Sequence, residues 1–195
     1  MRFLCGADAL LPAVCLVLTG CINVVPMIHT GPREVTEAKA LAKTLRRLAP
    51  EAKELVLKEH DVANAIKVTL DVTALADPVV FRSKLRLYRQ NLIEIRSRRS
   101  QVREAIAREV WQSPLVFAVQ QDALRTVDDA LLRGETWIQS AQNLQLRADL
   151  GQRKSFPELL VLGKELDKFL SGVAEEPLVE QIRTLQDEYR FGEGE

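Results

Sequence analysis

Residues 79–111 have the sequence VVFRSKLRLYRQNLIEIRSRRSQVREAIAREVW, and this stretch decides the fold. Its apolar residues recur at alternating steps of four and three, at Phe81, Leu85, Tyr88, Leu92, Ile95, Val102, Ile106 and Val110. This step places an apolar seam along one side of an α-helix, and only Arg99 interrupts it. The pattern therefore predicts a single helix over residues 79–111, about 50 Å long.

The segment that follows repeats the pattern after a short break at Ser113-Pro114. Its apolar and small residues keep the same step at Phe117, Leu124, Val127, Leu131, Gly134, Ile138, Ala141 and Ala148. We therefore expect a second helix over 114–150, closed by Gly151. Two long helices of matched length with a short connection predict an antiparallel hairpin with left-handed, coiled-coil-like packing. Gly134 and Ala141 fall on the seam, where small residues would let a neighbouring helix approach closely.

Shorter helices are expected on both sides of this hairpin. Ala38, Leu41, Ala42, Leu45 and Leu48 predict a helix over 33–48, and Pro50 suits the first turn of another helix over 51–76. The alternation over 68–72 would also fit a strand. Two further helices are expected over 157–170 and 177–191, closed by Gly172 and Gly192. The predicted fold class is all-α, a helical bundle that forms a single domain over residues 33–195.

The first 20 residues have the pattern of an export signal. Arg2 precedes an apolar run from Ala9 to Leu18, which is too short to span a bilayer as a helix, since about 20 residues are needed. The run ends in Leu18-Thr19-Gly20-Cys21. This motif resembles the lipobox of bacterial lipoproteins, in which Leu and small residues precede the Cys that receives the lipid.

The resemblance implies cleavage before Cys21, a diacylglycerol on its thiol and a further acyl chain on the new amino terminus. Residues 1–20 would then be the signal peptide, and residues 21–32 the lipidated Cys and its tether. Several acyl chains anchor a protein far more firmly than one. An ordinary secretory signal and an uncleaved anchor are the alternatives. Ile22 follows the Cys in place of Asp, which favours the periplasmic face of the outer membrane.

Little in the sequence indicates catalysis. The three cysteines are Cys5, Cys15 and Cys21, so residues 22–195 hold no disulfide, Cys-ligated zinc or thiol nucleophile. Glu59-His60-Asp61 is the only place where acids flank a histidine, but consecutive helical residues point about 100° apart and do not converge on one ion. No common hydrolase, nucleotide or dinucleotide motif occurs. We expect a non-enzymatic protein without metal or cofactor.

Charge is distributed unevenly, although Lys plus Arg and Asp plus Glu both number 27. Residues 79–108 contain nine cations and two acids, and residues 158–195 contain ten acids and four cations. One residue past the apolar seam runs a row of arginines that we call the arginine stripe: Arg82, Arg86, Arg89, Arg96 and Arg103. Either the acidic C-terminal helices or other helix-surface ion pairs neutralise the stripe, or it binds an anionic partner.

These features favour a membrane-anchored envelope lipoprotein that acts as a helical scaffold or adaptor and recruits a protein partner. The alternative is a binding module for an anionic lipid or cell-wall ligand, held by the arginine stripe. Nucleic acid is disfavoured as a partner, because an exported protein rarely meets it and no aromatic residues interleave with the arginines.

Overall fold

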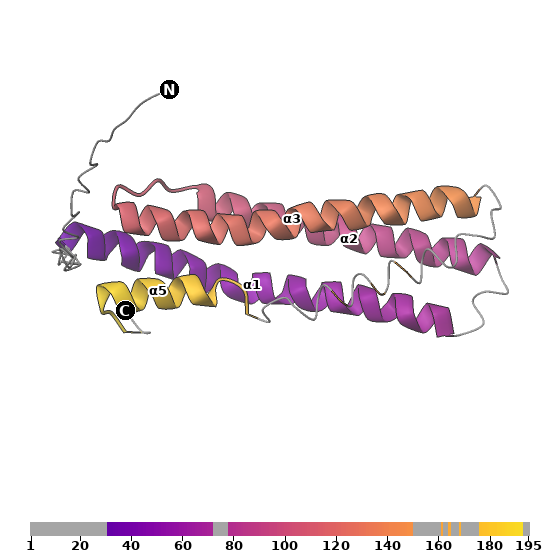
Figure 1. Ribbon diagram of the computed structural model, residues 1–195, viewed down its shortest axis with the longest axis horizontal. Helices are drawn as coiled ribbons and strands as arrows, with labels where there is room; N and C mark the ends of the chain where they lie inside the picture. The colour runs from indigo at the N-terminus through magenta and orange to yellow at the C-terminus, as the bar shows by residue number, and fades with distance from the viewer. Residues whose placement is uncertain are drawn as a thin grey trace, which may run out of the picture.

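The computed structural model describes residues 31–71, 78–149 and 176–192, together with residues 161, 164 and 168. Three long helices lie side by side: α1 (Pro32–Asp71), α2 (Pro78–Ala107) and α3 (Pro114–Asp149). The short helix α5 (Val179–Tyr189) packs on α1 and α3. Successive long helices run in opposite directions, so the molecule is a rod with the start of α1 at one end (Figure 1). The described residues contain no strand, which confirms the all-α bundle.

The predicted hairpin is confirmed, and its seam on α2 is the core of the molecule. Every seam position from Leu85 to Ile106 is buried, including the interrupting Arg99, whose exposed fraction is 6%. The buried residues of α1 and α5 join those of α2 and α3 in one continuous apolar cluster. The apolar residues predicted for the first helix, from Ala38 to Leu48, belong to the same cluster.

The predicted end of α2 is wrong by one turn, because the helix stops at Ala107 and not at Trp111. Val110 was expected on the seam but is 84% exposed. The physical reason lies in Gln120 of α3, whose buried side-chain amide donates to the carbonyl oxygens of Ile106 and Glu109 at 2.7 and 2.6 Å. These bonds satisfy carbonyls that a helix end leaves without partners, so the chain can turn early.

The seam of α3 is also shifted in its first turns. Phe117 was expected in the core but is 43% exposed, while its neighbour Val116 is fully buried. Leu124 and Leu131 are only half-buried, and Trp137, which lies off the predicted seam, is 6% exposed. The reason is that α3 contacts α1 and α5 as well as α2. Its buried side is therefore wider than the pattern of a two-helix seam predicts.

Gly134 does not have the role that its seam position suggested. It is buried, but a Cβ built at this position meets no atom within 4 Å. No neighbouring helix therefore needs a glycine here for close approach. Ala141 is 1% exposed, as a seam position should be.

The predicted break at Pro50 is wrong, since α1 continues through this residue for 40 residues. A proline inside a helix removes one backbone hydrogen bond and costs roughly 3 kcal/mol. Pro50 itself is exposed, while Leu48, Ala52 and Leu55 around it are buried in the core. Packing of these flanking residues offsets the local cost. The helix continues over residues 68–71, so the strand reading of that segment is wrong, and residues 72–76 lie outside the description.

The C-terminal helix α5 is confirmed, but it ends differently from the prediction. Arg190, not Gly192, adopts the left-handed conformation at the helix end, with φ 53°, and its backbone N–H donates to the carbonyl of Gln186. At the other end Leu178 has φ 74° and is 2% exposed. Left-handed backbone costs a non-glycine residue roughly 1–2 kcal/mol, which burial of a leucine side chain, worth about 1.5–3 kcal/mol, offsets.

The predicted helix over 157–170 lies outside the described residues, except that residues 161, 164 and 168 are helical. The expected caps Gly151 and Gly172 also lie outside them, as does the side chain of Ala148.

Candidate functional site

The lipidation candidate Cys21 lies outside the described residues, as does the tether as far as Thr30. The described chain begins at Gly31, one residue before α1, at one end of the rod. Among the described residues, none of the helices combines the length and the apolar character that crossing a membrane requires.

The arginine stripe faces α3, and two of its members form ion pairs there. Arg103 Nε lies 2.5 Å from Asp128 Oδ1, and its Nη2 lies 3.3 Å from Asp128 Oδ2, a bidentate contact. Arg96 Nε lies 2.7 Å from Glu135 Oε2. The arginines are seven residues apart on α2 and the acids are seven apart on α3. The pairs therefore repeat once per heptad, as flanking ion pairs do in coiled coils.

This spacing defines a register that extends by one more heptad. One heptad further along the antiparallel pair, the register places Arg89 opposite Gln142. We call these three rungs, Arg103 with Asp128, Arg96 with Glu135 and Arg89 with Gln142, the arginine ladder. The Arg89 rung differs from the other two because its α3 residue is an amide and not a carboxylate.

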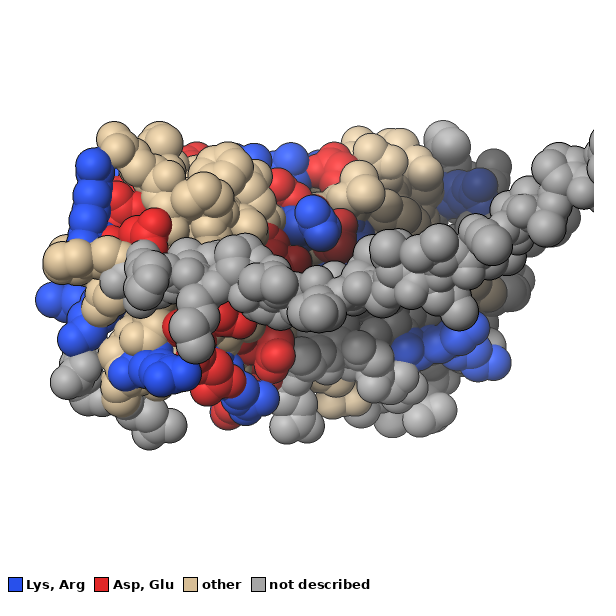
Figure 2. Space-filling model, turned by 60° about the vertical axis from the view of Figure 1, so that its left-hand side comes forward, with Lys and Arg blue, Asp and Glu red and all other residues tan. Residues whose placement is uncertain are grey.

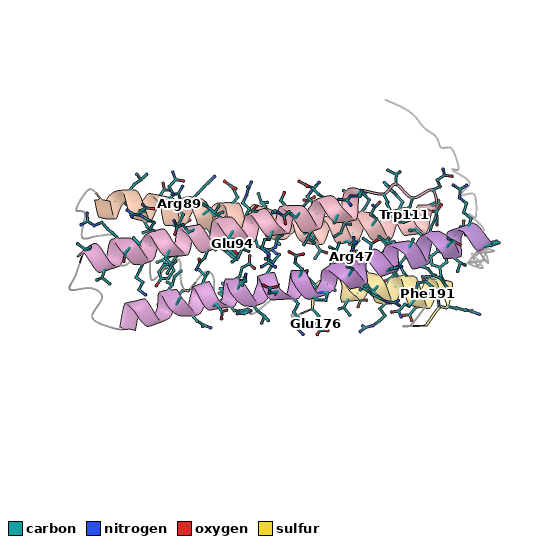
Figure 3. All side chains as sticks on the ribbon, turned by 180° about the vertical axis from the view of Figure 1, so that it is seen from behind. Arg47, Arg89, Glu94, Trp111, Glu176 and Phe191 are labelled. Carbon is teal, nitrogen blue, oxygen red and sulfur yellow. The ribbon has the colours of Figure 1, made fainter. Side chains whose placement is uncertain are left out.

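Arg89 and Arg86 make no ion pair within the part of the chain that the structure describes. Arg89 is half-buried, and its Nε is a buried donor without a hydrogen-bond acceptor. Arg86 is exposed. In Figure 3 Arg89 lies on the side of the hairpin away from α1, whereas Glu94 lies towards α1.

The opposite flank of α2 carries two arginines that the sequence analysis did not single out as a site. Arg98 is held by two acids of α1: its Nη1 lies 2.9 Å from Glu54 Oε1, and its Nε lies 3.3 Å from Glu51 Oε1. The hydrogen bond from Arg98, supported by one from Lys58, lowers the pKa of Glu54 to about 2. Glu54 in turn raises the pKa of Arg98.

The second arginine, Arg99, forms a buried ion pair with Glu59 of α1. The exposed fractions of the two residues are 6% and 4%, and Arg99 Nη1 also lies 3.5 Å from the carbonyl of Ala130 in α3. This pair joins all three long helices at one point. The signal in the sequence was the charged residue in the middle of an apolar seam, but its partner could not be identified without the fold.

The Glu59-His60-Asp61 segment diverges as expected. Glu59 turns into the core towards Arg99, His60 is half-buried and Asp61 is exposed. Across the described residues, no group of three or more His, Cys, Asp or Glu side chains is placed to hold a metal ion.

A cleft of about 320 Å³ lies between α1 and α2. Its polar lining comes from Lys58, Asp61, Asn91 and Glu94, and none of the stripe arginines contributes to it. Two acids and one lysine give this cleft the wrong charge balance for an anion. The stripe therefore lies away from this cleft.

The acidic C-terminal residues that the structure describes do not neutralise the stripe. Glu176 pairs with Lys53 of α1 at 2.6 Å, and Glu180 pairs with Arg183 of its own helix. On the face shown in Figure 2 acidic and basic side chains are interspersed. The neutralisation that the structure does show comes from α3.

The hairpin turn is held by a carboxylate from α1. Glu37 Oε2 accepts hydrogen bonds from the backbone N–H groups of Gln112 and Ser113, at 3.1 and 2.9 Å, just before α3 begins. These contacts, that of Ser113 foremost, lower the pKa of Glu37. Ser113 Oγ lies 2.9 Å from the hydroxyl of Tyr189 in α5. Trp111 beside the turn is half-buried and packs against the core.

No family model, curated protein or solved structure matches this chain.

Proposed function

We propose that this protein is a lipid-anchored helical adaptor of the bacterial envelope that recruits a protein partner and performs no catalysis itself. The observation that carries the proposal is the position of α1. It begins at Pro32, eleven residues after the lipobox cysteine Cys21, and continues for 40 residues along the rod. At 1.5 Å per residue this helix is about 60 Å long. A chain acylated at Cys21 would hold the rod by one end (Figure 1).

The arrangement of charge supports a protein partner over a small ligand. Arg86 and Arg96 of the arginine stripe are exposed, and the described cleft is lined by other residues. Small-molecule sites are concave and enclose most of their ligand, whereas a ridge of side chains suits a protein surface. Exposed apolar side chains lie on the same two helices, with Ile93 at 42% and Leu132 at 71% exposure.

The second candidate function is a binding module for an anionic lipid or cell-wall group. It is favoured by one observation, the two arginines Arg86 and Arg89, which have no acidic partner in the described part of the chain. For either function Ile22 in place of Asp supports attachment to the outer membrane, on its periplasmic face.

The anchor is tested by metabolic labelling with radioactive fatty acid in the bacterium. The wild-type protein should incorporate the label and partition with membranes, and Cys21→Ser should abolish labelling and leave the unprocessed precursor. Cys15→Ser is the matched control, since Cys15 lies inside the signal and should not change labelling. Label that persists in Cys21→Ser would disprove lipidation at this position.

The adaptor role is tested by crosslinking in intact envelopes. The lipidated protein should form a reproducible crosslink to one envelope protein, and Cys21→Ser, which releases the rod from the membrane, should reduce it. An envelope crosslinking pattern with no protein partner at all would contradict the adaptor function.

A further inference from the structure

At the Arg89 rung of the arginine ladder no carboxylate stands on α3, and the other two rungs show what is missing. Arg96 and Arg103 each contact a carboxylate of α3, with Nε to oxygen distances of 2.7 and 2.5 Å. The same register places Gln142 opposite Arg89. Gln142 is exposed and neutral, so the charge of this rung is not balanced across the interface.

The guanidinium of Arg89 has a buried donor for which the described residues supply no acceptor. Its Nε is buried and makes no hydrogen bond. A buried donor without an acceptor costs free energy relative to one that makes a hydrogen bond. An external group that accepts this hydrogen bond would recover that cost on binding.

A second arginine and two exposed apolar side chains surround the Arg89 rung. Arg86 lies three residues before Arg89, so the two are neighbours on the helix surface. Ile93 lies one turn after Arg89 on α2, and Leu146 lies one turn after Gln142 on α3, with exposed fractions of 42% and 54%. Since the helices are antiparallel, these two side chains flank the rung on opposite sides along the rod. Apolar flanks exclude water from a charged contact and strengthen it.

We propose that the Arg86 and Arg89 rung binds a carboxylate side chain on an acidic, partly apolar segment of a partner protein. The inference rests on the proposed adaptor function and names the chemistry of its partner. The carboxylate would pair with Arg89 as Glu135 and Asp128 pair with Arg96 and Arg103 on the other two rungs. Arginine binds carboxylates through two parallel N–H bonds, the geometry that Arg103 already shows with Asp128.

A protein carboxylate suits this place better than a lipid headgroup because the rung is far from the anchored end. The Tyr88 hydroxyl donates to the carbonyl of Ala65, so the rung lies level with this part of α1. Ala65 lies 33 residues after Pro32, the first residue of the helix. At 1.5 Å per residue the rung is about 50 Å from the end at which the tether enters.

The test adds a carboxylate opposite Arg89 by substitution within the chain itself. Gln142→Glu supplies the missing carboxylate in cis, and Arg86→Gln with Arg89→Gln removes the cations. The matched control is Gln121→Glu, which adds the same charge to an exposed position of α3 that lies 21 residues away. The full-length proteins are purified in detergent, and the probe is a fluorescent peptide of alternating Glu and Leu, followed by polarisation.

The wild type and Gln121→Glu should bind the peptide, with an affinity that falls as salt rises. Gln142→Glu and the double arginine variant should bind at least about tenfold more weakly, the effect of one lost charged contact. Gln142→Glu should also raise Tm by roughly 2–4 °C, because it supplies a carboxylate to the half-buried Arg89.

Three outcomes would overturn the proposal: a wild type that does not bind the peptide, equal binding by all variants, or binding of vesicles rich in phosphatidylglycerol in its place. The adaptor function is decided separately by the envelope crosslink. If Gln142→Glu crosslinks to the same partner as strongly as the wild type, the rung proposal fails and the adaptor function stands. If the wild type has no envelope partner, the adaptor function fails, and the peptide result still decides whether the rung binds carboxylates.

Discussion

The two flanks of α2 both carry arginines that pair with a neighbouring helix, but they differ in burial. On the α1 flank Arg99 and Glu59 are almost completely buried, and Arg98 is held by Glu51 and Glu54. On the α3 flank the side chains of Arg96 and Glu135 remain 50% and 42% exposed. Water and salt screen the attraction between exposed charges, whereas the attraction between buried charges is screened much less. The arginine pairs on the α1 flank therefore hold the helices together, whereas those on the α3 flank stabilise the helix contact only weakly.

The largest effect is expected from breaking the buried pair. Glu59→Ala leaves the Arg99 guanidinium buried without its counter-charge and should lower the free energy of unfolding by about 3–5 kcal/mol. Urea denaturation followed by circular dichroism measures the loss. Replacement of both residues by Leu should be close to neutral, since it removes both charges and adds apolar contacts. Glu94→Ala is the control on an exposed pair with Lys58. A loss no greater than the control's would show that the buried pair does not hold the helices.

An intermediate effect is expected from acid. The pKa of Glu54 is lowered to about 2 from a usual 4.5, chiefly by its hydrogen bond from Arg98. The stabilisation from a lowered carboxyl pKa is complete above the unfolded value and disappears as pH falls through the folded one. The urea midpoint of the wild type should therefore fall as pH decreases from about 5 to 2.

Glu54→Gln should lower the midpoint at pH 7 and make it less dependent on pH over this range. Arg98→Gln removes the same pair from the other side and should flatten the curve in the same direction. A Glu54→Gln curve parallel to that of the wild type would contradict the role assigned to this pair.

The smallest effect is expected on the α3 flank. Arg96→Gln and Arg103→Gln each remove one exposed pair, worth about 0–1 kcal/mol. A double-mutant cycle of Arg96→Gln with Glu135→Gln should give a coupling energy in that range, and the coupling should shrink in 1 M salt. A coupling that exceeds the loss in Glu59→Ala would reverse the contrast between the two flanks.

The periodic parts of the fold could be predicted from the sequence because the period is a local property. The seam from Leu85 to Ile106 follows from residue spacing alone, and every one of its members is buried. The helix ends could not be predicted as well. The early end of α2 depends on Gln120, which belongs to the next helix. Likewise, α1 continues through Pro50 because its flanking residues are buried against other elements.

The residues of the candidate site could be predicted from the sequence, but the partner of each residue could not. The sequence shows five arginines beside a seam, and it suggested that either the acidic C-terminal helices or other helix-surface ion pairs neutralise them, or that they bind an anionic partner. The structure pairs Arg96 and Arg103 with acids of α3, which are helix-surface ion pairs. The heptad spacing of Asp128, Glu135 and Gln142 was present in the sequence, but its register against the arginines required the two helices to be in contact.

The sequence by itself determined that this protein is helical, that the residues of α2 and α3 form a hairpin and that its N-terminus resembles a lipobox. These properties depend on residues within a few turns of each other, so a local pattern is sufficient. Only the tertiary structure decided that Arg99 pairs with Glu59 and that Glu37 of α1 holds the turn before α3. These partners are 40 to 76 residues apart in the chain. The energy of a charge depends on which groups surround it and on how much water remains, and packing sets both.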